Sequence, residues 1–368
     1  MSPLHICIIF AVFARTGVPL AQIRMAQAFA DRGHKVDLLV GHVLPGSSAQ
    51  ELEQLRGVNV VILGRSRVSA MVPFFIRYLK EALPDVVFSA QDHLNAAVLI
   101  AAIVSGSKAK ISASSRTYPL YEYPAGPLTK SWWLYKLMRT VARRANALTC
   151  VSEGVAAQYR SMSGDQRYVC VHNIVSTPSQ RERVAEKLSH PWFTDGSVPT
   201  LVAAGRLLDV KGFDILIRSV ALLRERRPVR LVLLGEGPER PRLEALIEDL
   251  NLRHYVRLEG EVENPLAYFG RADVFVLSSH FEGMPNVLIE AMMAGCTPVA
   301  TDCNSGPSEV IADGETGYLV PVNDHKALAA GIERALASPI DSNDLVRAVR
   351  PFEEDVVIDQ HFSLLGLQ

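Results

Sequence analysis

Residues 274–302, VFVLSSHFEGMPNVLIEAMMAGCTPVATD, read as a strand, a loop, a helix and a second strand. The two strand candidates are continuous apolar runs, which is typical of strands buried on both faces of a parallel sheet. Gly283 and Pro285 mark the turn between them, and Pro285 suits the first helical turn because its missing N–H costs nothing there. The helix supplies the crossover that parallel strands need. This stretch therefore predicts one βαβ unit of an α/β protein.

The same alternation of short apolar runs and helical patterns extends along the whole chain. The strand candidates of a first domain are HICIIFAVF, KVDLLVG, VNVVILG, DVVFSA, AKISAS, ALTCVS and YVCVHN. Those of a second domain are TLVAAG, VRLVLLG, VRLEG, VFVLSS, TPVATD and GYLVPV. We therefore expect an α/β fold of two doubly wound, Rossmann-like domains.

The boundaries of these domains follow from shifts in composition. The first domain is predicted over residues 1–175 and the second over residues 199–345. Residues 176–198 break the alternation with Pro, Ser and charged residues, and are predicted to be a linker. Residues 346–368 read as a C-terminal helical segment, which we expect to pack back toward the N-terminal domain.

Length and composition agree with this plan. A chain of 368 residues is too long for one ordinary core, and 48% hydrophobic with 21% charged residues is normal for a soluble globular enzyme. No apolar run approaches the roughly 20 residues that a bilayer span needs. The start, MSPLHICIIFAVF, lacks a basic region and a small-residue cleavage site, and reads as a buried strand. Five scattered cysteines favour reduced thiols in a cytoplasmic protein.

Charge is distributed unevenly between the two halves. Residues 1–175 contain 19 Lys or Arg and 10 Asp or Glu, whereas the remainder contains 19 and 29. The basic half indicates an anionic partner, either nucleic acid or an anionic membrane, unless the charges are simply scattered. Nucleic acid would need aromatic residues interleaved with the cations, and only Trp132 and Trp133 offer that.

The segment 126–147, GPLTKSWWLYKLMRTVARRANA, is the most distinctive feature of the basic half. On a helical projection its apolar side holds Trp133, Leu134, Leu137, Met138 and Val141, and its basic side holds Lys136, Arg139 and Arg143. We expect the apolar side to pack on the sheet and the basic side to face lipid phosphate. An interfacial membrane helix has the same pattern.

Two loops of the second domain lie at the carboxyl ends of strands, where ligands bind in open α/β sheets. In GRLLDVKGFD, Arg206 and Lys211 suit a diphosphate, since Arg offers a planar fork and Lys a point charge. A solvated loop is an equally acceptable interpretation of that stretch alone. In GEGPER, Arg240 stands where a dinucleotide fingerprint has its third glycine, which favours a tight turn into the next helix.

The acids Glu282 and Glu290 are surrounded by apolar residues, and burying an acid without a specific partner is costly. The backbone amides of Asn286 and Val287 predict an anion site at the helix start, with Glu282 before this site and Glu290 one turn inside the helix. Glu282 would then face sugar hydroxyls, and Glu290 could accept two hydrogen bonds from a vicinal diol such as that of ribose. The alternative is that Glu282 caps the helix and Glu290 forms an ion pair.

Residues 201–336 closely resemble the C-terminal domain of retaining GT-B glycosyltransferases of family 4. The resemblance rests on GRLLDVKGFD, GEGPER, the pair Glu282 and Glu290, and GPSEVIADGETGYLVPVND. The first domain matches more loosely through TGVPLAQIRMAQAFADRGHKVDLLV, PDVVFSAQDHLN, ALTCVSEGV and VHNIV. FEGMPN with DCNSGPSEVI is similar to the branch that extends glycans on polyprenyl-diphosphate carriers.

The resemblance implies a role for each matching residue. Glu282 and His93 would contact the transferred sugar as catalytic residues. Donor binding would use Gly17, Arg206, Lys211, Glu261, Val262, Met284, Asn286, Val287 and Glu290, with Glu261 and Val262 flanking the base. Arg116 and Asn95 become candidates for acceptor contact. The usual double glycine after the first strand is Thr16-Gly17 here, and Met284-Pro285-Asn286 removes one amide from its loop.

The implied activity is that of a retaining, metal-independent hexosyltransferase of cell-surface polysaccharide synthesis. A nucleotide sugar, with a UDP-sugar favoured, would be the substrate donor, a glycan or lipid-linked molecule the acceptor, and no cofactor or metal would be needed. The chain has no D-x-D motif. We expect it in the cytoplasm, peripheral on the inner face of the membrane, and without nucleic acid. The alternatives are a UDP-sugar epimerase or phosphorylase, and a non-enzymatic nucleotide-binding module.

Overall fold

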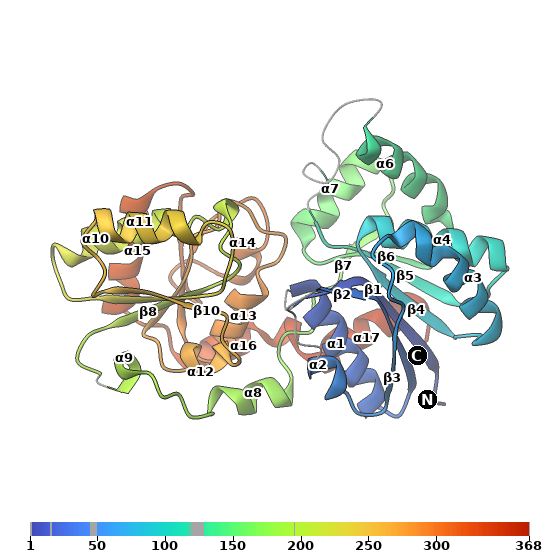
Figure 1. Ribbon diagram of the computed structural model, residues 1–368, viewed down its shortest axis with the longest axis horizontal. Coiled ribbons are helices and arrows are strands. Elements are labelled where there is room, and N and C mark those ends of the chain that lie inside the picture. Colours follow the sequence, from blue (N-terminus) through green and yellow to red (C-terminus); the bar gives the residue numbers. More distant parts are fainter. Residues whose placement is uncertain are drawn as a thin grey trace. The chain divides into compact units, whose positions relative to one another are not determined.

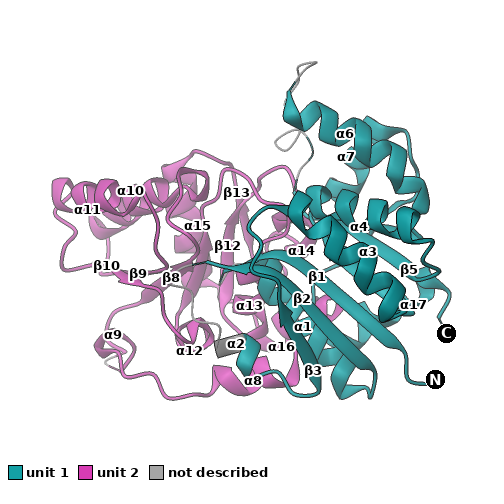
Figure 2. Ribbon diagram, turned by 45° about the vertical axis from the view of Figure 1, so that its right-hand side comes forward, with its two compact units in different colours: residues 1–174, 354–368 teal, residues 175–353 magenta. Residues whose placement is uncertain are grey.

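A computed structural model describes residues 2–14, 17–44, 50–117, 119, 129–194 and 196–367 (Figure 1). The chain divides into two compact units (Figure 2). Unit 1 comprises residues 1–174 and 354–368, and unit 2 comprises residues 175–353. Within the described part of the chain, no helix is both long and apolar enough to cross a membrane.

Unit 1 is built on a parallel sheet with the strand order β3-β2-β1-β4-β5-β6-β7. Its strands are β1 (His5–Phe13), β2 (Lys35–Val43), β3 (Val58–Ile62), β4 (Val86–Ala90), β5 (Lys110–Ser115), β6 (Ala147–Cys150) and β7 (Tyr168–Cys170). The central strands β1 and β4 are buried almost throughout, which is why they read as continuous apolar runs.

Helices connect these strands and cover the sheet. They include α1 (Gly17–Asp31), α2 (Gln50–Glu53), α3 (Val72–Glu81), α4 (Asp92–Ser105), α6 (Lys130–Val141), α7 (Glu153–Ser163) and α17 (Glu354–Leu365). Phe88 of β4 and Phe362 of α17 both stack on Phe29 of α1, with ring centroids 5.3 and 5.4 Å from it. The last helix of the chain is therefore part of the core of unit 1.

Unit 2 is a second parallel sheet, in the order β10-β9-β8-β11-β12-β13. The strands are β8 (Thr200–Ala204), β9 (Arg230–Leu234), β10 (Val256–Gly260), β11 (Val274–Leu277), β12 (Thr297–Thr301) and β13 (Tyr318–Val320). On one side lie α10 (Phe213–Arg224), α11 (Arg240–Asp249) and α15 (His325–Ala337); on the other lie α12 (Pro265–Phe269), α13 (Asn286–Met293) and α16 (Ser342–Ala348) (Figure 1). The predicted fold class, two doubly wound Rossmann-like domains, is confirmed.

In each unit the strand order reverses at one point. The first strand of unit 1, β1, has β2 on one side and β4 on the other, and β8 of unit 2 has β9 and β11 as neighbours. Chains leaving neighbouring strands at such a point go to opposite faces of the sheet, and the resulting crevice is where doubly wound folds bind ligands. The structure therefore directs attention to the loops after β1, β4, β8 and β11.

The unit boundaries differ from the domain boundaries expected from the sequence. The segment 176–198, expected to be a linker, lies inside unit 2 and contains α8 (Pro178–Val184) and α9 (Pro191–Thr194). Pro178 and Ser179 lie in the first turn of α8, where the Thr177 hydroxyl accepts from the backbone N–H of Gln180, and Trp192 is buried. Of the C-terminal segment 346–368, residues 354–368 belong to unit 1 and the rest to unit 2.

Helix α6 exposes more apolar surface than the helical projection predicts. Met138 and Val141 are buried as expected, but Trp133 is 59% exposed and Leu137 is 40% exposed. The prediction that this whole apolar side packs on the sheet is wrong, because Trp133 and Leu137 face solvent although α6 contacts α4. Lys136, Arg139 and Arg143 are exposed as expected. The ammonium of Lys136 lies 5.2 Å from the centre of the Trp132 ring. Residues 126–128 of this segment lie outside the described part.

Candidate functional site

The loop after β8 carries the two cations that the sequence singled out. Arg206 is exposed, and its guanidinium has no ion-pair partner among the described residues. Lys211 ends a 3-10 turn, η3 (Asp209–Lys211), and its side chain is only 21% exposed. Its Nζ lies 2.6 Å from Oε1 of Glu282, on the loop after β11. The reversal point of unit 2 therefore joins Lys211 and Glu282, which are 71 residues apart.

Gly212 explains how these two loops come so close. It has φ +59°, in the left-handed region, and a Cβ there would lie 2.2 Å from the carbonyl oxygen of Ser278. The contact is held on both sides, because Ser278 Oγ donates to the carbonyl of Lys211 at 2.8 Å and the N–H of His280 donates to that of Val210 at 2.8 Å. Only glycine permits this approach.

Both acids of the opening stretch are nearly buried. Glu282 and Glu290 are each 8% exposed. Besides Lys211, Glu282 accepts a hydrogen bond from Ser279 Oγ at 2.6 Å. The alternative that Glu282 caps the helix is wrong, because α13 begins at Asn286 with Pro285 at its cap position. Glu282 forms an ion pair with Lys211, the kind of interaction that the alternative assigned to Glu290.

Helix α13 places the remaining donor candidates of this stretch. Asn286 and Val287 are in its first turn, at the positive end of the helix dipole. Glu290 follows Asn286 by four residues and so lies on the same face one turn further on. Met284 precedes the helix and is 9% exposed. Backbone amides and an acid therefore share one end of one helix.

The two glycines of GEGPER pack against the loop that carries the cations. A Cβ at Gly235 would lie 2.1 Å from the carbonyl oxygen of Gly205, and one at Gly237 would lie 2.3 Å from that of Leu207. The N–H of Leu207 donates to the carbonyl of Glu236 at 2.9 Å. The glycines are needed for contact between two loops, and α11 starts directly afterwards at Arg240, which agrees with the tight-turn interpretation.

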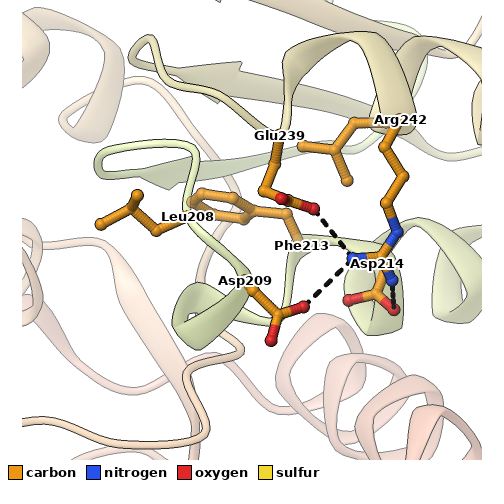
Figure 3. Close-up of a pocket in the computed structure, with 7 residues that line it drawn as sticks. Leu208, Asp209, Phe213, Asp214, Glu239 and Arg242 are labelled. Carbon is orange, nitrogen blue, oxygen red and sulfur yellow. Dashed lines mark hydrogen bonds and ion pairs between the residues drawn. The ribbon is translucent and has the colours of Figure 1, made fainter.

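Arg242, on α11, braces the cation-bearing loop from outside (Figure 3). Its guanidinium donates to Asp209 of η3 at 3.1 Å, to Glu239 at 2.8 Å and to Asp214 in the first turn of α10 at 3.3 Å. The hydrogen bonds to Glu239 and Asp209 and the charge of Asp214 raise the pKa of Arg242 above its ordinary value. The sequence analysis missed this residue. The pair Glu239 and Arg242, three apart on a helix, was visible, but Asp209 is 33 residues away.

Glu261 and Val262 follow β10, two strands from β8. Glu261 is exposed and Val262 is half-buried. The N–H of Gly235 donates to the carbonyl of Gly260 at 2.7 Å, which ties the end of β10 to the GEGPER loop. These two candidates therefore lie along the same edge of the sheet as Arg206, which is compatible with contact to the base of a nucleotide.

In unit 1, the candidates follow the strands at its own reversal point. Gly17 is the exposed first residue of α1, after β1, while its neighbour Thr16 is outside the described residues. His93 is the half-buried second residue of α4, after β4, and burial lowers its pKa. Next to it, buried Asp92 accepts from Ser115 Oγ at 2.5 Å and from Tyr159 Oη at 2.7 Å. These bonds fix the start of α4.

The structure requires a correction for Asn95, one of the two acceptor candidates. Asn95 is fully buried; it accepts from Ser89 Oγ at 2.7 Å and donates to the carbonyl of Ser114 at 2.9 Å. It has no exposed atom to offer an acceptor, so we assign it to joining β4 and β5. Arg116 follows β5 and donates to Asn173. Burial lowers the pKa of Arg116 to about 10, and its Nε is buried with no hydrogen-bond partner among the described residues.

In the part of the chain that the structure describes, no group of three or more His, Cys, Asp or Glu is placed to hold a metal ion. The charged side chains of the unit 2 site include the cations Arg206 and Lys211 and the acids Glu282 and Glu290, and the amide end of α13 adds partial positive charge.

Two family models match the chain in succession. Residues 17–178 match Glycosyltransferase Family 4, and residues 185–351 match Glycosyl transferases group 1. The chain belongs to glycosyltransferase family 4. The resemblance inferred from the motifs is confirmed, and each of the two models covers one Rossmann-like half of the molecule.

Curated relatives carry names from glycan synthesis. The chain is 29% identical over 229 residues to the lipopolysaccharide core biosynthesis glycosyltransferase LpsE of Rhizobium meliloti, a match covering 61% of this chain and 65% of the relative. It is 39% identical over 136 residues, 37% of each chain, to the N-acetylgalactosamine-N,N'-diacetylbacillosaminyl-diphospho-undecaprenol 4-alpha-N-acetylgalactosaminyltransferase of Campylobacter jejuni. The matches therefore span less than two thirds of the length of each of these relatives.

Solved structures with the same fold extend over the whole chain. Anabaena Alr3699/HepE in complex with UDP and glucose superposes with a TM-score of 0.79 at 19% identity, covering 99% of this chain and 100% of that one. The lipopolysaccharide outer core galactosyltransferase WaaB gives a TM-score of 0.73 at 18% identity, covering 98% and 99%. At these identities the likeness establishes the GT-B fold.

Proposed function

We propose that this chain is a glycosyltransferase that moves a sugar from a nucleotide-sugar donor to a glycan or lipid-linked acceptor in cell-surface polysaccharide synthesis. The observation that carries the proposal is the grouping of Arg206, Lys211, Glu282 and the start of α13 at the reversal point of unit 2. Cations and helix amides suit a diphosphate, and buried acids suit sugar hydroxyls. The names of the relatives support the acceptor class, and the UDP complex of HepE supports a UDP-sugar as donor.

The residues then divide the donor between them. Arg206 and Lys211 hold the diphosphate together with the amides of Asn286 and Val287, while Gly17 lets backbone approach it. Glu290 accepts from the ribose hydroxyls, and Glu261 and Val262 flank the base. Glu282 and His93 contact the transferred sugar, Met284 lies beside it, and Arg116 contacts the acceptor. These roles are the family pattern carried onto the positions of this chain.

The reaction is proposed to retain the anomeric configuration without a metal ion. The acceptor oxygen forms the new bond to the anomeric carbon while the bond from that carbon to the phosphate oxygen breaks. The electron pair of the broken bond stays on the phosphate, which takes the acceptor's proton. The cations and helix amides offset the charge that develops on the leaving diphosphate.

Nucleotide release tests the enzyme class. Purified protein is incubated with UDP-, GDP- and ADP-sugars, with and without a membrane extract that supplies lipid-linked acceptors. We expect nucleoside diphosphate release that depends on the extract and favours a UDP-sugar. Conversion of the sugar without any acceptor would favour an epimerase or phosphorylase, and nucleotide binding without release would favour a binding module.

Arg206 provides the test of charge stabilisation. Arg206→Ala is expected to raise the activation free energy of transfer by about 3 kcal/mol, the scale for losing one charge-stabilising donor. Transfer by the parent should persist in a strong chelator. Activity that is abolished by chelator and restored by manganese would contradict metal independence, whatever the effect of Arg206→Ala.

We also propose that α6 docks on an anionic membrane surface. Its exposed surface combines Trp133 and Leu137 with Lys136, Arg139 and Arg143. Aromatic and aliphatic side chains beside cations are typical of helices at a lipid interface. The net positive charge of residues 1–175 complements anionic lipid headgroups.

Vesicle binding tests this docking. The parent should bind anionic vesicles more tightly than neutral ones, and less tightly as salt rises. Replacing Lys136, Arg139 and Arg143 by Gln should cost about 3 kcal/mol of membrane affinity, at about 1 kcal/mol per cation. Trp133→Ser with Leu137→Ser should weaken binding further. If the triple variant binds anionic vesicles as well as the parent, α6 does not dock on the membrane.

A further inference from the structure

The proposed function gives Lys211 to the diphosphate and Glu282 to the sugar, yet these two side chains form an ion pair with each other. Lys211 Nζ lies 2.6 Å from Oε1 of Glu282. A carboxylate is thus held within ion-pair distance of the ammonium that is proposed to bind the phosphates. Two anionic groups that share one ammonium also repel each other across it. The pair therefore has a consequence for how tightly diphosphates bind.

Several contacts show that the pair is built into the fold. The carbonyls of Lys211 and Val210 accept hydrogen bonds from Ser278 Oγ and the N–H of His280, both at 2.8 Å. The loop that carries Lys211 and the loop after β11 are therefore held together by their backbones, and the absence of a side chain at Gly212 makes this close contact possible.

The side chain of Glu282 is itself fixed. Ser279 Oγ donates to the same Oε1 at 2.6 Å, so two donors converge on one carboxylate oxygen. The side chain is 9% exposed, and in such a site solvent screens charge much less than at an exposed surface. Glu282 consequently cannot swing away from Lys211 without losing both contacts.

We infer that Glu282 weakens the binding of the nucleoside diphosphate product by competing with it for Lys211, and so promotes product release. This inference rests on the proposed function of the same site. When the bond from the anomeric carbon to the phosphate oxygen breaks, the sugar leaves with the acceptor. The terminal phosphate then has an additional ionisable oxygen, with a pKa near 6 by analogy with phosphate monoesters. At neutral pH the product is thus more negative than the donor, and its repulsion by Glu282 is greater.

Titration of the parent and of Glu282→Gln with UDP, GDP and ADP tests the inference. For the diphosphate that the parent binds best, Glu282→Gln should bind roughly tenfold more tightly, as expected for removing one buried charge near a phosphate. The matching nucleoside monophosphate lacks the terminal phosphate, so its affinity should not change. Product inhibition of Glu282→Gln should strengthen in parallel.

Two further variants assign the effect to Lys211. In Glu282→Gln with Lys211→Met, the gain in diphosphate affinity should disappear, because no ammonium is left to be freed. Glu290→Gln removes the same charge at an equally buried position of the same motif and should weaken binding instead. If Glu282→Gln does not fold, Glu282→Ala also removes the charge and should tighten diphosphate binding in the same way.

The outcomes separate this inference from the function beneath it. Equal or weaker diphosphate binding by Glu282→Gln would overturn the inference, as would an equal gain for the monophosphate. A parent protein that binds none of the three diphosphates would instead overturn the proposed nucleotide-sugar function.

Discussion

At the scale of single residues, Gly212 controls whether the cation-bearing loop reaches the loop of the acids. Gly212→Ala would place a Cβ 2.2 Å from the carbonyl of Ser278, in a backbone with φ +59°. The loop must then shift and take Lys211 with it, so we expect nucleotide affinity to fall at least tenfold. Titration with UDP measures this.

Gly314 provides the matched control for Gly212. It has φ +81°, but nothing lies within 4 Å of its Cβ position. Gly314→Ala should therefore cost about 1–2 kcal/mol of stability from backbone strain alone. Its nucleotide affinity should stay at that of the parent. Similar losses of affinity in both variants would mean that strain, and not the clash with Ser278, is responsible.

The two buried acids are expected to differ in kinetics. Glu290→Gln weakens an acceptor for the ribose hydroxyls and should reduce donor affinity by about 1.5–3 kcal/mol, the range for hydrogen bonds to charged groups. Glu282→Gln should mainly lower kcat, because its charge matters most as positive charge develops on the sugar. Steady-state kinetics with varied donor separates the two; a kcat effect confined to Glu290→Gln would reverse the assigned roles.

The sequence was informative about which residues matter here and less so about their partners. Residue type and position after a strand singled out Arg206, Lys211, Glu282 and Glu290. The bond between Lys211 and Glu282 was not predictable, since it depends on a glycine that admits a backbone contact between loops 71 residues apart. Asn95 was misassigned because it lies two residues after His93 on α4, and residues two apart on a helix point to nearly opposite sides.

At the scale of elements, the loop after β8 is held by helix α11 through Arg242. Removing this brace should increase the mobility of η3 and of Lys211. We expect Arg242→Ala to raise the donor KM several-fold with little change in kcat. The melting temperature should hardly change, because exposed ion pairs contribute little to stability.

The exposed pair of Arg253 and Glu248 at the other end of α11 supplies the control for Arg242. Arg253→Ala should leave both kinetic constants unchanged. Arg242→Lys should recover part of the lost affinity, since one ammonium can still contact a nearby carboxylate. An unchanged KM in Arg242→Ala would show that the loop keeps its place without the brace.

Helix α6 shows what periodicity can and cannot settle at this scale. The spacing of its residues correctly predicted a helix with an apolar and a basic side. It could not tell how wide a stripe the neighbouring helix α4 covers, because that depends on tertiary packing. Trp133 and Leu137 stay exposed although α6 contacts α4.

At the scale of the whole molecule, the C-terminal helix makes unit 1 sensitive to acid. His361 of α17 is buried; burial first, and then the charge of Arg116, lower its pKa from 6.5 to about 3. Below pH 6.5, His361 therefore binds a proton in the unfolded chain but stays neutral in the folded chain until the pH approaches 3. Stability should be complete above about pH 6.5 and decline as the pH falls toward 3, by at most about 1.4 kcal/mol per pH unit from this residue.

Thermal unfolding between pH 8 and pH 4.5 measures this contribution. His361→Leu should lose less stability than the parent as the pH falls, while exposed His254→Gln should follow the parent. If the parent and His361→Leu lose stability in parallel, protonation of His361 is not a source of acid sensitivity.

The overall plan of two Rossmann-like units was predictable because buried parallel strands have a strong apolar signature. The boundaries of the two units were harder to predict from the sequence. The composition of residues 176–198 resembled that of a linker, but Pro178 and Pro191 begin the helices α8 and α9, and burial of Trp192 by distant residues cannot be seen locally. The division of residues 346–368 between the units likewise depends on stacking among Phe29, Phe88 and Phe362.

The path of the chain also suggests how the protein can be recombined with its relatives. The N–H groups of Val175 and Ser176 both donate to the carbonyl of Phe352 at 3.1 Å, so the first and last residues of unit 2 lie side by side. Unit 2 is therefore a cassette inserted into unit 1, with junctions at 174/175 and 353/354. A chimera spliced at both junctions would exchange the proposed nucleotide-sugar site and keep α17 in its own core. A single splice at residue 345 would graft a foreign helix onto that core instead.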